Sequence, residues 1–474
     1  MAKYIDKKEI ENQKDYIEKL KNYVNRFCAE HGRAPRANTE TYGCQQNEND
    51  TERIRGILHE AGYDFTQTAE DADLVIYNTC AVRENAEQKV FGRIGILKHI
   101  KESRPDMVIC LCGCMVQQEH ITEKIKRLHN HIDLIFGTHM LYKLPELLYN
   151  VLEEKKKQVA IPDSDGVIAE DMPILHDAKE KAWVSVMYGC NNFCSYCIVP
   201  YVRGRERSRT PEAVIAEVRA LVDKGCSEIS LLGQNVNSYG KDLEENVDFS
   251  DLLRMVNAVD GVKRIRFMTS HPKDLSDRLV DAIAECDKVC RQLHLPFQAG
   301  SDKVLKSMNR RYTKAEYLQK IEKVKKRIPD ISLSTDVIVG YPTETNEDFE
   351  DTLDVIRKVE FDSIFSFIYS RREGTPAAKL DFVLDEKEIH RNFNRLLEVQ
   401  NEISLKKNEA YIGTEQLILV DGESKNDPEM LTGRTESGKA VNFKGEKNLI
   451  GKYINVRITE ARTWSLNGEI CDEN

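Results

Sequence analysis

The chain has 474 residues, thirteen of them cysteine, and a formal net charge of −10. This length predicts two to four domains, and the odd, scattered cysteines argue against the disulfide framework of a small secreted protein. The acidic total argues against broad, nonspecific nucleic-acid binding, and the charged first residues lead into no apolar run, so we expect a soluble, cytoplasmic protein without a membrane anchor.

The first half of the chain predicts a helix followed by an α/β domain. Residues 8–30 have helical apolar spacing, which we interpret as an N-terminal helical extension (residues 1–36) attached as an appendage. Residues 37–155 alternate short apolar segments with amphipathic helices, the pattern of a small α/β domain with a parallel sheet. Its strands are expected at 74–77, 107–109 and 132–135, and its helices at 86–99 and 121–128. Polar residues 156–180 predict a linker.

Three cysteines of this domain lie at or just past expected strands. Cys44, Cys80 and Cys114 come from different strands, and parallel strands end on the same edge of a sheet. Together they predict a metal cluster with an open metal position, although widely separated cysteines are also often small buried hydrophobes. Strand alternation puts Cys110, Cys112 and Cys114 on the same side of the strand. Cys114 lies nearest the strand end and is therefore the preferred third ligand.

A second set of cysteines lies on one short loop. Residues 188–197, YGCNNFCSYC, place Cys190, Cys194 and Cys197 at a three-then-two spacing. Three soft thiolates with no fourth ligand nearby favour an iron-sulfur cluster over structural zinc, and four irons held by three thiolates leave one iron open to a small molecule. A partial zinc site and chance cysteines are the alternatives.

Four arginines alternate along the chain just past this loop: Arg203, Arg205, Arg207 and Arg209. Guanidinium groups beside a reaction centre predict binding of substrate phosphates, here those of RNA. The alternative is a solvated arginine face balanced by nearby carboxylates.

Residues 181–408 repeat the strand and helix alternation at least six times. Strands are expected at 183–188, 228–232, 264–268, 291–295, 331–338 and 363–369, which predicts an open, partial (βα)6 TIM-like barrel. Chemistry collects at the carboxyl ends of such strands, where the polar candidates are Gln234, Asn235, Ser270 and Gln298. Each of these has the alternative of an ordinary capped strand end. Asp336 lies inside an apolar strand and therefore needs a partner or a function.

Residues 409–474 change to strand-like alternation at 416–420, 439–443 and 453–458. Short strands with glycine-containing turns predict a small C-terminal β-barrel. Barrels of this size often bind RNA, but the segment has more Asp and Glu than Lys and Arg, so fold type supports an RNA role more than charge does.

From residue 41 onward these motifs resemble the radical S-adenosylmethionine (SAM) methylthiotransferases. The C-x-x-x-C-x-x-C loop with an aromatic residue before its last cysteine is typical of the radical SAM superfamily. Residues 78–87, 187–194, 201–209, 232–240 and 269–272 are similar to the branch that acts on isopentenylated adenosine in tRNA. The branches acting on threonylcarbamoyladenosine or on ribosomal protein S12 usually differ there. Thr343 departs from the glycine common in the family, and the last domain is not basic.

The resemblance implies two [4Fe-4S] clusters and a domain order. Cys44, Cys80 and Cys114 of a methylthiotransferase domain would hold an auxiliary cluster, a radical SAM core would follow, and a TRAM domain would contact tRNA. Cys190, Cys194 and Cys197 would hold the cluster that binds SAM. As a hypothesis, the polar candidates line the SAM or base pocket, with Gln234 and Asp336 as the catalytic candidates: Gln234, Asn235, Ser270, Gln298 and Asp336.

The implied activity is methylthiolation of carbon 2 of N6-isopentenyladenosine, next to the anticodon of a tRNA. That C–H bond is unactivated and needs a radical route through a cofactor. The resemblance implies that one SAM yields the radical, a second SAM the methyl group, and the auxiliary cluster the sulfur. The base must leave its stack, which a single-stranded anticodon loop makes cheap.

The expected partners are a tRNA and an electron donor such as flavodoxin or ferredoxin, with no membrane, and the expected state is a monomer. Two other substrates stay open, threonylcarbamoyladenosine tRNA and ribosomal protein S12. A different class of function, a noncatalytic iron-sulfur electron carrier or an RNA-binding module, also stays open.

Overall fold

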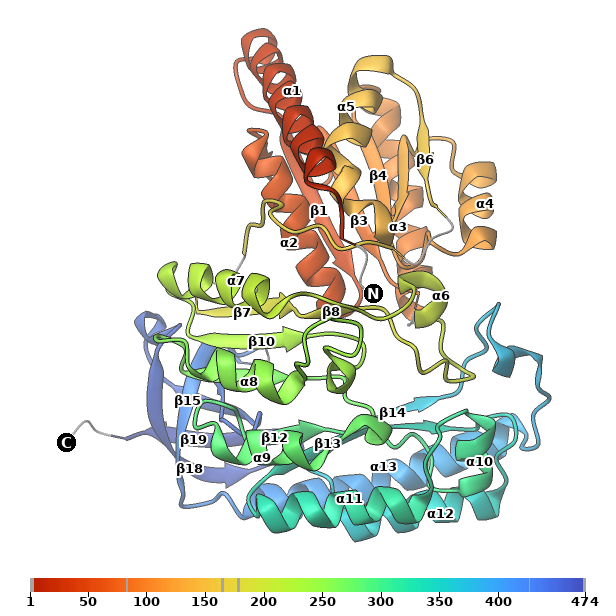
Figure 1. Cartoon of the computed structure of the whole chain (residues 1–474), viewed down its shortest axis with the longest axis vertical. Helices are drawn as coiled ribbons and strands as arrows, with labels where there is room; N and C mark the ends of the chain where they lie inside the picture. The colour runs from red at the N-terminus through yellow and green to blue at the C-terminus, as the bar shows by residue number, and fades with distance from the viewer. Residues whose placement is uncertain (1–3, 82–83, 163–165, 177–179, 426, 472–474) are drawn as a thin grey trace.

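The computed structural model describes residues 4–81, 84–162, 166–176, 180–425 and 427–471. An α/β unit, an incomplete barrel and a small closed barrel follow one another along the chain (Figure 1). In Figure 1 the α/β unit stands above the incomplete barrel, and the closed barrel lies at the left of the lower half. Among the described residues, no helix has the length and apolarity needed to cross a membrane.

The α/β unit is built on a six-stranded parallel sheet in the order β2-β1-β3-β4-β5-β6. Alternate strand residues face two apolar layers: Leu74 and Ile76 pack on one side and Val75 and Tyr77 on the other, as in a doubly wound sheet. The predicted parallel α/β domain is confirmed. Its elements are β1 (Arg36–Tyr42), α2 (Gln45–Glu60), β2 (Asp64–Phe65), β3 (Leu74–Thr79), α3 (Glu84–Ser103), β4 (Val108–Gly113), α4 (Glu119–Leu128), β5 (Leu134–Gly137), η1 (Thr138–Lys143), α5 (Leu144–Glu154) and β6 (Gln158–Ala160).

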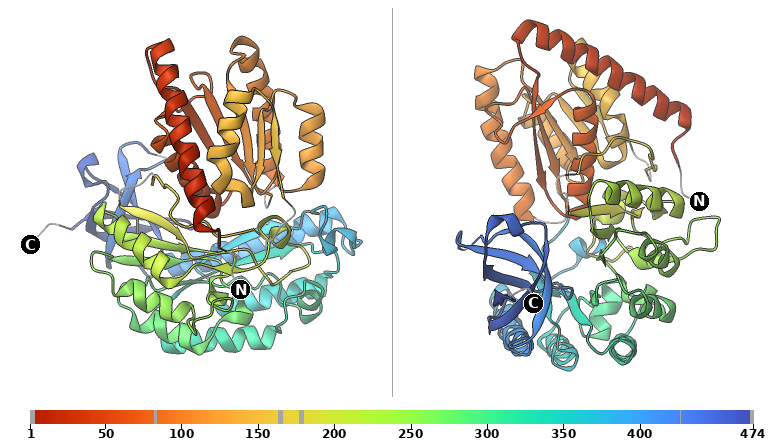
Figure 2. Two further views of the ribbon diagram at one scale, coloured as in Figure 1. Left: turned by 45° about the horizontal axis from the view of Figure 1, so that its top comes forward. Right: turned by 90° about the vertical axis from the view of Figure 1, so that its left-hand side faces the viewer.

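Two boundaries differ from expectation. Helix α1 (Lys7–His31) buries Ile17, Leu20 and Val24 in the same apolar layer as α2, α5 and the sheet, so it covers the domain and is no appendage (Figure 2). An amphipathic stripe of this kind needs a cover, which the sheet provides. Strand β6 lies inside the expected linker, because its backbone pairs with β5. Residues 163–165 and 177–179 of that linker lie outside the described residues.

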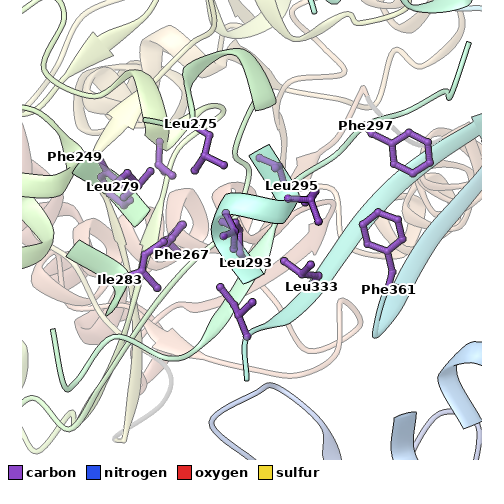
Figure 3. Close-up of a cluster of buried hydrophobic side chains, with 14 of the residues drawn as sticks. Phe249, Phe267, Leu275, Leu279, Ile283, Leu293, Leu295, Phe297, Leu333 and Phe361 are labelled. Atoms are coloured by element: carbon purple, nitrogen blue, oxygen red, sulfur yellow. The ribbon is translucent and has the colours of Figure 1, made fainter. Parts of the chain in front are cut away.

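The middle of the chain forms the predicted partial barrel. Two parallel three-stranded sheets, β7-β10-β11 and β12-β13-β14, are joined by the pairing of Ile265 with Val289. Phe249, Leu293 and Phe361 belong to the large apolar layer between these strands and their helices, shown in Figure 3. The strands are β7 (Lys181–Ser185), β10 (Glu228–Leu232), β11 (Arg264–Phe267), β12 (Gln292–His294), β13 (Ser332–Val339) and β14 (Ser363–Ile368). The helices are α7 (Pro211–Asp223), α8 (Phe249–Asn257), α9 (Asp277–Glu285), α10 (Asp302–Ser307), α11 (Lys314–Arg327), α12 (Asn346–Val359) and α13 (Glu386–Glu409).

The strand expected at 183–188 is interrupted after Ser185. Met187–Tyr188 (β8) turns out of the barrel sheet and pairs antiparallel with Arg207–Ser208 (β9). Between them lie the cysteine loop and a short helix, α6 (Val199–Arg203). Gly189 adopts φ 75°, and a Cβ there would lie 2.0 Å from the Arg205 carbonyl oxygen, so the base of the loop requires glycine.

The C-terminal segment closes into a five-stranded barrel in the order β15-β16-β17-β19-β18, as predicted. It sits at the amino ends of β11 and β12, where buried Arg264 and Arg266 donate hydrogen bonds to its backbone carbonyls. Its strands are β15 (Glu415–Glu423), β16 (Met430–Arg434), β17 (Ala440–Lys444), β18 (Tyr453–Ala461) and β19 (Leu466–Ile470).

Candidate cluster and substrate sites

The loops that carry Cys44, Cys80 and Cys114 meet at one edge of the α/β sheet. They follow the neighbouring strands β1, β3 and β4, as the sequence predicts. A Cβ on Gly43 would lie 2.9 Å from the Cys80 Cβ, so the first two loops touch. Burial, together with the nearby Cys80 and Cys44, raises the pKa of the Cys114 thiol to about 12, against the opposing effect of the Arg203 guanidinium.

A network of asparagines holds these loops together. Asn47 donates its amide hydrogens to the side-chain oxygen of Asn78 and to the Thr79 carbonyl, both at 3.0 Å, and Asn78 donates back to the Asn47 carbonyl at 2.8 Å. The Cys114 N–H donates to the Thr79 carbonyl at 2.8 Å. Gly113, at φ 98°, permits this approach, since a Cβ would meet the Thr79 carbonyl oxygen at 2.4 Å.

Cys110 and Cys112 pack inside the apolar layer of the sheet. Cys114 instead contacts Ala81, Ile198 and Val202, where the α/β unit meets α6. Cys114 is thus directed away from the other two cysteines by the turn at Gly113 rather than by strand alternation, and its choice as the third ligand stays a prediction. Val82 and Arg83, part of the motif at residues 78–87, lie outside the described residues.

Arg203 ties α6 to this thiol cluster. Its Nε donates to the Cys114 Sγ at 3.2 Å, and its Nη2 donates to Asp50 at 2.8 Å and to Asn47 at 3.2 Å. Its side chain is only 7% exposed. This guanidinium therefore faces the interior between the two domains and not solvent.

The expectation that all four arginines contact RNA phosphates is corrected by their burial. Arg209 is held by Glu170 and Glu217, and Arg207 donates to the carbonyls of Arg203 and Arg205. Partly buried carboxylates and nearby backbone carbonyls therefore satisfy these two guanidinium groups inside the protein. Arg205 alone is exposed, and its guanidinium stacks 4.4 Å from the Phe193 ring centre.

The loop with Cys190, Cys194 and Cys197 is fixed at the carboxyl edge of the barrel. The Ser195 N–H donates to the Met308 carbonyl at 3.0 Å, and the Asn309 amide donates to the Phe193 carbonyl at 2.9 Å. Burial, together with the nearby Cys194, raises the pKa of Cys190 to about 11 and that of Cys197 to about 12.

Within the described part of the chain, no three His, Cys, Asp or Glu side chains are placed to hold one metal ion. A [4Fe-4S] cluster is held by a separate thiolate on each ligated iron. The assignment of a cluster to either set of three thiols stays a prediction.

Several buried polar atoms beside the second loop have no hydrogen-bond partner among the described residues. Buried polar groups are normally satisfied, so a group of orphaned ones marks the place of a ligand. They lie just past β10 and β11, and three of the residues were predicted to bind a ligand. The orphaned atoms are Gln234 Oε1, Asn235 Oδ1, Asn237 Oδ1, Ser270 Oγ and His271 Nε2.

Gln298 and Asp336 lie on neighbouring backbone segments of the barrel. Gln298 is buried in the left-handed region at φ 69°, and its backbone pairs with Val337. The Asp336 carboxylate lies 3.5 Å from His294 Nε2 and is 28% exposed, on the strand face opposite the helices. His294, whose Nδ1 lies 3.0 Å from Ser334 Oγ, is the partner that a carboxylate inside a strand requires.

Sequence reasoning missed two residues of this region. His294 lies in the middle of a predicted strand, and Arg310 follows α10, where its side chain reaches the Cys194 Sγ at 3.5 Å. The only signal for His294 was a polar residue at a lumen-facing position of an apolar strand. Arg310 carried no signal of its own.

Three family models match consecutive parts of the chain. Residues 36–137 match the family described as "Uncharacterized protein family UPF0004", residues 184–356 the radical SAM superfamily, and residues 409–471 the TRAM domain.

Curated relatives match along almost the whole chain. A protein of Alkaliphilus oremlandii is 53% identical over 469 residues, covering 99% of this chain and 98% of its own length. One of Acetivibrio thermocellus is 52% identical over 467 residues, covering 98% and 97%. One of Clostridioides difficile is 53% identical over 460 residues, covering 97% and 96%. All three are named tRNA-2-methylthio-N(6)-dimethylallyladenosine synthase.

Solved structures share the fold at low identity. The radical SAM methyltransferase TsrM from Kitasatospora setae matches with a TM-score of 0.54 at 15% identity, over 73% of this chain and 77% of that one. The cobalamin-dependent radical SAM enzyme OxsB matches with a TM-score of 0.51 at 12% identity, over 90% and 64%. These likenesses support an α/β unit joined to a radical SAM barrel.

Proposed function

The chain belongs to the family of tRNA-2-methylthio-N(6)-dimethylallyladenosine synthases, and from this premise we propose that it methylthiolates carbon 2 of N6-isopentenyladenosine beside the anticodon. N6-isopentenyladenosine and N6-dimethylallyladenosine are two names for the same nucleoside. It is a radical SAM enzyme of the kind that uses a [4Fe-4S] cluster, SAM and a tRNA substrate. The observation that carries the proposal is a pair of three-thiol sites on two domains in direct contact.

We assign the SAM cluster to Cys190, Cys194 and Cys197. When bound there, the cluster and SAM would supply the radical chemistry that the unactivated carbon 2 needs. The protein's part is to hold SAM, and the orphaned atoms of Gln234, Asn235 and Ser270 support that role, since polar groups of a ligand would satisfy them. Gln234 and Asp336 remain the catalytic candidates.

We assign the auxiliary cluster to Cys44, Cys80 and Cys114. This cluster supplies the sulfur of the methylthio group when bound. Arg203 supports the assignment, because a guanidinium that donates to the Cys114 sulfur stabilises its thiolate form. The same residue joins the two domains, so the auxiliary site is fixed relative to the SAM site.

The barrel lumen would take the flipped base. Asp336 and His294 offer a carboxylate and an imidazole as hydrogen-bonding groups on the lumen face. At the rim, exposed Arg205 and Tyr201 flank Phe193, a combination suited to stacking RNA bases and to contacting phosphate. A flavodoxin or ferredoxin electron donor and a monomeric state belong to the same proposal.

The test is tRNA analysis in cells that lack their own methylthiolation enzyme. Expression of the wild type is expected to convert isopentenyladenosine to its 2-methylthio derivative, measured by mass spectrometry of digested tRNA. Cys44→Ala is expected to abolish the conversion, whereas Cys28→Ala, half-buried on α1, is expected to retain it. Unmodified isopentenyladenosine after expression of folded, cluster-loaded wild type would reject the substrate. Product on threonylcarbamoyladenosine or ribosomal protein S12 would then identify a sister activity.

A further inference from the structure

Two phenylalanines of the last barrel strand are exposed where an apolar residue would normally be covered. Phe365 is 48% exposed and Phe367 45% exposed, although both lie in β14. Ile364, which precedes Phe365 and faces the other side of the strand, is buried in the apolar layer beneath the helices. Phe365 and Phe367 therefore point to the opposite face, the lumen of the barrel.

The strand register sets their neighbours. Phe365 pairs with Asp336, and Phe367 pairs with Ile338, so all four side chains share one face. The Phe365 ring lies 5.7 Å from the His294 ring, edge to face. One wall of the lumen thus combines an apolar row, Phe365, Phe367 and Ile338, with the polar pair of Asp336 and His294.

Backbone contacts connect this wall to the segment that contacts the cysteine loop. Arg310, which contacts the Cys194 sulfur, also donates to the Pro296 carbonyl. Two residues further on, Gln298 pairs through its backbone with Val337, between Asp336 and Ile338. A base held against the wall would lie inside the barrel at the height where the SAM site opens.

We propose that Phe365, Phe367 and Ile338 form the subsite that receives the isopentenyl substituent of the substrate base and thereby determine specificity for it. The inference rests on the proposed function. An isopentenyl group has five carbons and no polar atom, so it gains by displacing water from exposed aromatic rings. A threonylcarbamoyl group at the same nitrogen carries a carboxylate, which the apolar row and the neighbouring Asp336 disfavour.

The test compares two synthetic anticodon stem-loops, one with isopentenyladenosine and one with plain adenosine. For the wild type, the isopentenylated RNA is expected to bind more tightly. Phe367→Ala is expected to lower kcat/KM on that RNA by about 10- to 100-fold and to bring the two affinities together. Phe367→Leu, which keeps an apolar side chain, is expected to restore most of the difference. Met255→Ala removes an exposed apolar group from α8 on the outer surface and should change nothing.

The outcomes separate this inference from the proposed function. If the wild type forms no methylthio product from isopentenylated RNA, the proposed function fails. If the wild type turns over while Phe367→Ala keeps its kcat/KM and its affinity difference, the subsite alone is wrong. Production of 5′-deoxyadenosine from SAM reports that the variant is folded and loaded. If Phe367→Ala forms no 5′-deoxyadenosine, Ile338→Ala takes its place. The kcat/KM of that variant on isopentenylated RNA and its difference in affinity between the two RNAs then test the subsite.

Discussion

The side chain of Cys114 points in a different direction from those of Cys110 and Cys112. The left-handed turn at Gly113 moves it out of the strand alternation and against α6. We expect Cys114→Ala to reduce the iron bound per chain by about half after reconstitution, because one of two clusters loses a ligand. SAM cleavage should persist and methylthio product should vanish. Cys112→Ala, in the apolar layer, is the matched control, and equal iron in Cys114→Ala and wild type would contradict the assignment.

Glu344 makes stability depend on pH. Its carboxyl group is buried and accepts a hydrogen bond from the Gly340 N–H at 2.6 Å, and burial raises its pKa to about 8. The folded state therefore holds a proton that the unfolded chain releases near its ordinary pKa of about 4.3. The free energy of unfolding should fall as pH rises between these two values, because the unfolded state binds fewer protons there.

Glu344→Gln keeps an oxygen acceptor for Gly340 and removes the titrating group. We expect this variant to lose a few kcal/mol of pH dependence between about pH 4 and pH 8, measured by denaturant unfolding across that range. Glu469→Gln, at an exposed position, should keep the wild-type slope. An unchanged slope in Glu344→Gln would show that other groups cause the dependence.

At the residue scale, the sequence predicts where cysteine side chains lie better than it predicts the partners of arginine side chains. Cysteine spacing on one loop, and cysteines just past parallel strands, translate directly into proximity. The alternation of Arg203, Arg205, Arg207 and Arg209 carries no information on which carboxylates lie nearby. Glu170 and Glu217, which hold Arg209, come from the expected linker and from α7, and only the folded chain brings them together.

Strands predicted from apolar alternation are present, whereas strands without it were either missed or, like β1 before Cys44, expected without bounds. β1 reads RANTETY, yet six of its residues pair with β3 and it lies between two partners in the sheet. Backbone pairing stabilises such a strand whatever its side chains, so hydrophobic patterning gave no signal. β16 and β19, five residues each, were missed in the C-terminal barrel for the related reason that glycine interrupts their alternation.

Among the elements, β11 is the anchor for the C-terminal barrel. Arg266 donates to the Thr435 carbonyl at 2.8 Å and the Glu436 carbonyl at 2.9 Å, and its Nε lies 3.2 Å from buried Glu228. We expect Arg266→Met to destabilise this junction by about 1–3 kcal/mol, since two hydrogen bonds are lost while Glu228 keeps Arg264 at 3.8 Å. Hydrogen exchange of residues 430–436 measures the effect. Arg457→Met, at an exposed ion pair, should leave exchange unchanged.

At the scale of the whole molecule, the α/β unit is docked on the barrel through polar contacts. Asn49 on α2 donates to the Trp183 carbonyl at 3.0 Å and accepts from Ser185 Oγ at 2.7 Å, and Gln46 donates to the same hydroxyl at 2.7 Å. The Thr138 hydroxyl donates to the Val202 carbonyl at 2.7 Å. The sequence predicted two separate domains, but their docking depends on contacts between residues 64 to 139 positions apart.

This docking has a chemical consequence, because each three-thiol site belongs to a different domain. Asn49→Ala removes two hydrogen bonds from the junction and touches no cysteine. A small displacement of reacting groups lowers the reaction rate far more than it lowers the affinity for substrate. We therefore expect the yield of methylthio product to fall about 10-fold or more while SAM cleavage continues. The ratio of 5′-deoxyadenosine to methylthio product, measured in one reaction by mass spectrometry, should therefore rise.

A purely destabilising substitution would lower both products together, so the ratio separates positioning from loss of folded enzyme. Gln416→Ala, on the C-terminal barrel and far from the junction in sequence, should keep the wild-type ratio. If Asn49→Ala also keeps it, the two sites tolerate movement between the domains, and the fixed docking seen here is not required for sulfur transfer. If the ratio rises, the polar junction is part of the catalytic arrangement, because it sets the path between the sulfur site and the carbon radical.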